Sequence, residues 1–139
     1  MAYRYEISWM LQGRVIFVRL EGDLESAGIP FIQTYDAEIN RYLNDGTAPL
    51  IHIIVDMTAV AALPSFREMA HTFTFPGHPR TGWAITVGAR VNPVFRMVTH
   101  LTTQIVRMRF RQVDTMEDAF QFLLGVDTTL GNADAQSYA

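Results

Sequence analysis

Apolar and polar side chains alternate along residues 3–10, where three aromatic residues and Ile7 share one side of the pattern. A period of two predicts a strand with one buried face. Residues 14–20 are almost entirely apolar, which predicts a second strand lying deeper in the sheet. Because Gln12-Gly13 leaves no room for a crossover, the two strands are expected to pair as an antiparallel hairpin.

The central apolar stretch, residues 50–55, is rich in β-branched side chains and predicts a strand buried on both faces of a partly parallel sheet. The chain then turns polar at Asp56 and Thr58 and passes Pro64-Ser65 before a predicted helix over residues 66–73. In open α/β folds, functional surfaces usually lie where a central strand ends and leads into a helix N-terminus. The loop between this strand and this helix is therefore the candidate functional region.

Apolar side chains recur at helical spacing in three further segments. In the first, residues 31–43, Asp36 is placed with the polar residues on the solvent side, and Ser26 is the expected N-cap. The second, residues 92–108, begins with Asn-Pro, which is a helix-starting pair. The third follows Thr115, whose hydroxyl is expected to cap it.

Two short apolar segments, residues 83–87 and 110–113, complete the pattern as predicted strands, the second of them at a sheet edge. The element order ββαβαβαβα predicts a single α/β domain with a mixed sheet of about five strands and helices mainly on one face. The domain is expected to span residues 1–127. Residues 128–139 are mostly small and polar, which predicts a flexible C-terminal tail.

Composition narrows the classes of partner. Hydrophobic residues make up 49% of the chain and charged residues 18%, an apolar balance that indicates a homodimer face. The formal net charge of −3 argues against nucleic-acid binding. The absence of cysteine excludes disulfides, thiolate metal sites and thiol nucleophiles. No apolar run is long enough for a membrane span, so a cytoplasmic location is expected.

Three phrases of the sequence carry a resemblance to a known family. The first phrase, residues 18–25, ends a strand with glycine, an acid, leucine and a second acid. The second, residues 55–65, carries an aspartate, an apolar residue, a threonine and a valine. The third, residues 115–120, begins a helix with a small polar residue, acids and alanine. In this order they resemble the STAS domain of bacterial anti-sigma-factor antagonists and of sulphate transporters. The resemblance covers roughly residues 5–124, and it implies a STAS-like fold with a regulatory, protein-binding role.

One loop departs from the family pattern. In the antagonists a serine in an Asp-Ser-Ser-Gly loop is phosphorylated, whereas the aligned residues here are Pro64-Ser65-Phe66-Arg67. Only Ser65 remains as the candidate phosphorylation residue, next to the position that the family modifies. With such a loop, the chain also resembles stand-alone STAS-like or lipid-carrier-like bacterial proteins.

Several of these residues have a plainer interpretation as well. The plainer role of Ser65 is to cap the helix that follows it, and the plainer role of Asp56 and Thr58 is to satisfy backbone N–H groups of the loop. The four histidines are scattered without ligand spacing, so structural roles are expected for them, and neither a metal nor a cofactor is expected.

Two functions remain open. The first is a non-enzymatic regulatory or protein-interaction module, with its partner-binding residues at Asp56, Thr58, Pro64, Ser65, Phe66 and Arg67. The alternative is a domain that binds or carries a small hydrophobic ligand or a lipid, in a pocket lined by Phe73, Phe75 and Trp83. No nucleophile is paired with a base, so no catalytic residue is assigned, and an enzyme such as a hydrolase ranks third.

Overall fold

The computed structural model describes residues 3–88 and 109–130. Within them, five strands form one sheet in the order β1-β2-β3-β4-β5. β1 is antiparallel to β2, and β2 to β5 are parallel to one another. The elements are β1 (Tyr3–Leu11), β2 (Val15–Asp23), α1 (Leu24–Asp45), β3 (Ile51–Ala62), α2 (Phe66–Thr72), the short 3-10 helix η1 (Phe75–Gly77), β4 (Thr81–Val87), β5 (Arg109–Val113) and α4 (Met116–Val126).

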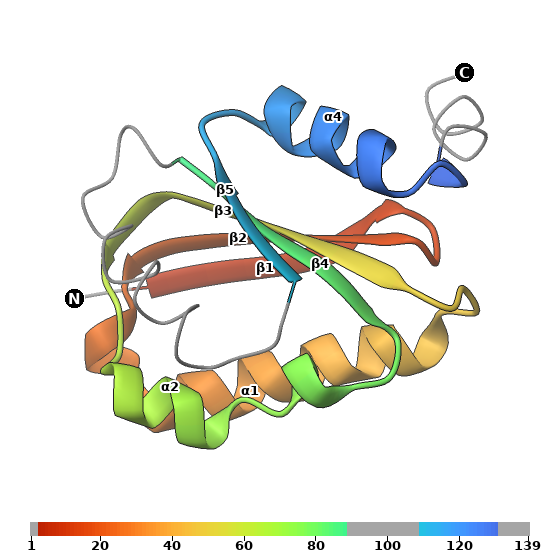
Figure 1. The fold of residues 1–139 in the computed structure, drawn as a ribbon. Helices are drawn as coiled ribbons and strands as arrows, with labels where there is room; N and C mark the ends of the chain where they lie inside the picture. Colours follow the sequence, from red (N-terminus) through yellow and green to blue (C-terminus); the bar gives the residue numbers. More distant parts are fainter. Residues whose placement is uncertain (1–2, 89–108, 131–139) are drawn as a thin grey trace.

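The sheet lies between two layers of helix. Helices α1 and α2 cover one face and α4 covers the other, as Figure 1 shows. The protein is thus an α/β domain with a mixed five-stranded sheet, as the hydrophobic pattern predicts, and the opening hairpin and the edge position of β5 are also confirmed. The predicted helix over residues 92–108 lies outside the described residues. Among the described residues, no helix combines the length and the apolar character that crossing a membrane requires.

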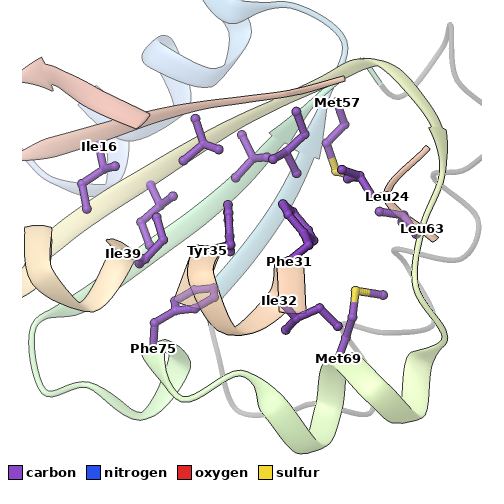
Figure 2. Close-up of a cluster of buried hydrophobic side chains, with 14 of the residues drawn as sticks. Ile16, Leu24, Phe31, Ile32, Tyr35, Ile39, Met57, Leu63, Met69 and Phe75 are labelled. Atoms are coloured by element: carbon purple, nitrogen blue, oxygen red, sulfur yellow. The ribbon is translucent and has the colours of Figure 1, made fainter. Parts of the chain in front are cut away.

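Two apolar cores follow from the alternation of side chains along the strands. The larger core lies between the sheet and helices α1 and α2, and its side chains point from both layers toward one another (Figure 2). The smaller core lies between the sheet and α4. Leu130 is fully buried in this second core, so the packed part of the chain extends three residues beyond the predicted boundary at residue 127.

Helix α1 begins earlier than the sequence predicts. Its N-cap is Asp23, whose carboxylate accepts hydrogen bonds from the backbone N–H of Ser26 at 3.1 Å and from the Ser26 hydroxyl at 2.6 Å. The prediction that Ser26 caps the helix is therefore wrong, because the acid three residues earlier takes that role. Gly28, at φ 62°, kinks the helix, and Pro30 falls in the first turn after the kink, where its missing N–H is tolerated.

Strand β3 is longer than predicted. It continues through Asp56 and Thr58 to Ala62, so the polar loop expected directly after Val55 is part of the strand. The extension is supported by parallel pairing with β2, which continues to the pair formed by Asp23 and Ala62. The loop that does follow β3 is correspondingly short.

Candidate functional site: an apolar pocket

A pocket of about 120 Å³ lies between the sheet and the α1 and α2 layer. Its floor is made by alternate residues of four neighbouring parallel strands, and its walls come from α1, from α2 and from the segments flanking α2. The floor residues are Leu20, Val55, Met57, Ala84, Thr86 and Phe110, and the wall residues are Leu24, Phe31, Tyr35, Leu63, Pro64, Met69, Phe73 and Phe75.

The strand register explains why these floor residues meet. Val55 pairs with Thr86, and Ala84 pairs with Phe110, so their side chains lie side by side on one face of the sheet. Most of the floor is made by large apolar side chains. The small side chain of Ala84 between them leaves space above β4 that a larger residue would fill.

Aromatic rings form one wall of the pocket. Tyr35 lies 5.7 Å from Phe73 and 6.3 Å from Phe75 between ring centroids, in edge-to-face arrangements. Phe31 lies 5.7 Å from the same tyrosine. Burial, and secondarily the negative charge of Asp36, raise the pKa of the Tyr35 hydroxyl far above its ordinary value, so the wall stays uncharged.

Asp36 fixes this wall to α1. One carboxylate oxygen accepts hydrogen bonds from the backbone N–H groups of Thr74 at 2.8 Å and Phe75 at 2.9 Å, and the other accepts from the Thr74 hydroxyl at 2.6 Å. The side chain is only 7% exposed, so the prediction that Asp36 faces solvent is wrong. The helical pattern of the sequence places Asp36 on the polar face of α1. Its hydrogen-bond partners come from the segment after α2, which is distant in sequence.

Thr86 is the polar exception in the floor. The residue is 5% exposed, and among the described residues its hydroxyl has no hydrogen-bond partner. Its cross-strand neighbours are Val55 in β3 and Gln112 in β5, and the pocket floor beside it is otherwise made by apolar side chains.

The predicted pocket residues are only partly brought together. Phe73 and Phe75 line the pocket. Trp83 does not, because it lies on the opposite face of β4, where its ring packs edge to face against Phe122 at 4.8 Å between centroids. The alternation of side chains along β4 separates Trp83 from the pocket by the thickness of the sheet.

The predicted partner-binding residues are also divided between two places. Pro64 is buried and lines the pocket, whereas Ser65 and Arg67 are exposed at the start of α2, whose first residue is Phe66. Ser65 forms a capping box: its hydroxyl accepts from the Glu68 backbone N–H at 3.2 Å, and its own N–H donates to the Glu68 carboxylate at 3.3 Å. The interpretation of Ser65 as an N-cap is confirmed.

Asp56 lies away from that loop, on the α4 side of β3, and Thr58 is an exposed residue of the same strand. The placement of Asp56 follows from alternation, because Val55 and Met57 belong to the core under α1, whereas Ile54 belongs to the core under α4. Asp56 accepts a hydrogen bond from the Thr58 N–H at 3.0 Å and forms an ion pair with Arg19 at 3.5 Å. The plainer interpretation of Asp56, satisfaction of a nearby backbone N–H, is confirmed.

A polar cluster centred on His52 occupies the opposite side of the sheet. The Nδ1 atom of His52 accepts from the Trp83 backbone N–H at 2.9 Å, so the neutral ring carries its proton on Nε2 and donates it to Asp127 at 2.8 Å. Burial lowers the pKa of His52, although Asp127 opposes that effect. Arg14 lies 3.5 Å from the same carboxylate.

This cluster has the features of a structural connection between the sheet and the end of α4. Both ring nitrogens of His52 are already bonded within the protein, so neither is free to exchange a proton with a substrate. His78 is likewise engaged, with Asn44 at 2.8 Å. In the described part of the chain, no three histidine, aspartate or glutamate side chains gather in a way that would hold a metal ion.

The sequence matches no protein-family model and no curated protein.

Proposed function

We propose that this protein binds a small apolar molecule in the pocket between its sheet and helices α1 and α2. The observation that carries the proposal is the pocket itself, whose surface is almost wholly apolar. Its volume of about 120 Å³ is close to that of engineered cavities of about 150 Å³ that bind benzene. A single ring, or a short aliphatic chain, is therefore the size of ligand that fits.

An empty pocket lowers the stability of the folded protein, and a bound ligand would offset this loss. Cavities in protein cores destabilise by about 24 cal/mol for each Å³, which amounts to about 3 kcal/mol for this volume. Natural cores contain few voids larger than a water molecule. An apolar ligand would recover part of this cost on binding.

The role that follows is that of a non-enzymatic binding or carrier domain. In the part of the chain that the structure describes, no charged side chain lines the pocket, and the one ionisable group of that lining, Tyr35, has a raised pKa and remains protonated. Such a lining can hold a neutral molecule, and its described residues supply no charged acid or base with which to transform it. Resemblance to lipid-carrier-like STAS proteins is in keeping with this role and remains part of the proposal.

Filling the pocket tests the proposal. In Ala84→Leu the larger side chain should occupy the space, so the melting temperature should stay equal or rise, while the stabilisation that toluene gives the wild type should disappear. The matched control is Ala61→Leu, an exposed residue of the same sheet, which should keep the toluene effect. The proposal fails if toluene leaves the wild-type melting temperature unchanged and Ala84→Leu destabilises the protein by about 1–3 kcal/mol. That loss is typical of overpacking a core that is already filled.

A second candidate function is the binding of a protein partner at the start of α2. It is favoured by the exposure of Ser65 and Arg67 beside Pro64, which itself lines the pocket. Through Pro64, an occupied pocket could alter the surface that a partner meets. Capture of partners with the wild type, with Arg67→Glu and with the exposed control Arg41→Glu tests this function; equal partner sets for all three would argue against this surface.

A further inference from the structure

One polar side chain, that of Thr86, lies in the floor of the pocket. Thr86 occupies the middle of β4, its side chain lines the pocket, and its hydroxyl lacks a hydrogen-bond partner among the described residues. A buried hydroxyl without a partner is unfavourable, since it has given up its hydrogen bonds to water. Valine has nearly the same shape and would fill this position without that penalty.

We propose that the Thr86 hydroxyl selects the ligand: the pocket takes a small, neutral molecule that pairs a ring-sized apolar body with one hydroxyl or carbonyl oxygen. This inference rests on the proposed function and makes it more specific. The apolar lining accounts for the body of the ligand, and the hydroxyl at the floor accounts for its single oxygen.

The chemistry of the lining restricts the ligand further. The carboxylate that holds the wall in place, that of Asp36, directs its oxygens to Thr74 and Phe75, so it is not available to balance a cationic ligand. No arginine lines the pocket in the described part of the chain, so an anionic ligand has no counter-ion there either. A neutral oxygen that can accept from Thr86, or both accept and donate, is the group that fits.

The position of Thr86 also sets the orientation of the ligand. Thr86 pairs with Val55 in β3 and with Gln112 in β5. Among its neighbours, Val55 and Ala84, which precedes it in β4 by two residues, line the pocket floor beside its hydroxyl. The aromatic wall formed by Tyr35, Phe73 and Phe75 faces this floor. The oxygen of the ligand would therefore lie against β4, and its apolar body would contact the rings of the wall.

Phenol and toluene are a matched pair of probes, because they differ by a hydroxyl in place of a methyl group. Their dissociation constants can be measured by ligand-observed NMR for the wild type, for Thr86→Val and for the exposed control Thr58→Val. The ratio of the phenol constant to the toluene constant should rise about tenfold in Thr86→Val, the loss expected for one neutral hydrogen bond. The ratio should not change in Thr58→Val.

The outcomes separate this inference from the function on which it rests. If both probes bind the wild type and Thr86→Val leaves their ratio unchanged, the hydroxyl does not select the ligand, although the pocket binds apolar molecules. If neither probe binds the wild type, side chains of the protein itself fill the pocket and both proposals fail. Should Thr86→Val not fold, Thr86→Ser and Thr86→Ala replace it: serine should keep the wild-type ratio and alanine should raise it.

Discussion

The carboxylate of Asp36 is the main polar contact between helix α1 and the segment that enters η1, and Asp36→Ala removes it. The change deletes three hydrogen bonds and leaves the backbone N–H groups of Thr74 and Phe75 without an acceptor. A hydrogen bond to a charged group contributes about 1.5–3 kcal/mol. Because the three bonds share one side chain, their contributions do not add fully, and we expect a loss of about 3 kcal/mol in the free energy of unfolding.

Urea denaturation followed by circular dichroism measures this loss. Asp36→Asn keeps one acceptor oxygen without the charge and should lose about half as much stability. Asp45→Ala, an exposed acid in the last turn of the same helix, is the control and should stay within about 0.5 kcal/mol of the wild type. A loss as small as this for Asp36→Ala would refute the reasoning, since it would mean that the contact does not hold the pocket wall in solution.

Three other changes test the remaining contacts. Burial lowers the pKa of His52 below its ordinary 6.5, so the stability that the neutral ring contributes is complete above pH 6.5 and is lost as the pH falls through the lowered pKa. The urea midpoint of His52→Gln should therefore fall less than that of the wild type between about pH 7.5 and about pH 5.5. An equal fall in both proteins would contradict this. Ser65→Ala should cost about 1 kcal/mol through loss of the cap, and an unchanged denaturation midpoint would argue against the capping box. Gly82→Ala should lower the free energy of unfolding by about 2 kcal/mol, because the added Cβ would lie 2.5 Å from the His52 ring. The control Gly125→Ala, in the open last turns of α4, should raise it by about 0.5–1 kcal/mol. Equal denaturation midpoints for the two variants would show that the ring does not crowd Gly82.

The local pattern of apolar and polar residues predicts the order of strands and helices and two of the helix caps. The hairpin and the caps at Ser65 and Thr115 depend on neighbours close in sequence, and the presence of each further strand follows from its own run of apolar residues, so periodicity and capping chemistry predict them. The length of β3 was not predictable in this way. Its extension depends on a partner strand thirty or more residues away, whose register the local pattern around Asp56 does not reveal.

The candidate site shows the same division. Phe73 and Phe75 could be assigned to a pocket because they are aromatic residues flanking a loop, but Trp83 has the same local appearance and faces the other side of the sheet. A signal for this was present in the sequence: Trp83 and Ala84 are adjacent in a strand, so they must face opposite sides. The burial of Asp36 had no such signal, because its partners come from a segment that returns to α1 only after β3 and α2.

The pocket can stay open because polar contacts, rather than apolar packing alone, hold its walls. The capping box at Ser65 fixes the start of α2 beside Pro64, and Asp36 fixes the aromatic segment around Phe75. An apolar wall without such contacts could move inward and close the space, which is how many cores reduce the cost of a cavity. Here, inward movement of the wall would break hydrogen bonds to a buried carboxylate, which opposes closure of the space that the proposed ligand would occupy. The polar contacts that surround the pocket are therefore as important to the proposed function as the apolar side chains that line it.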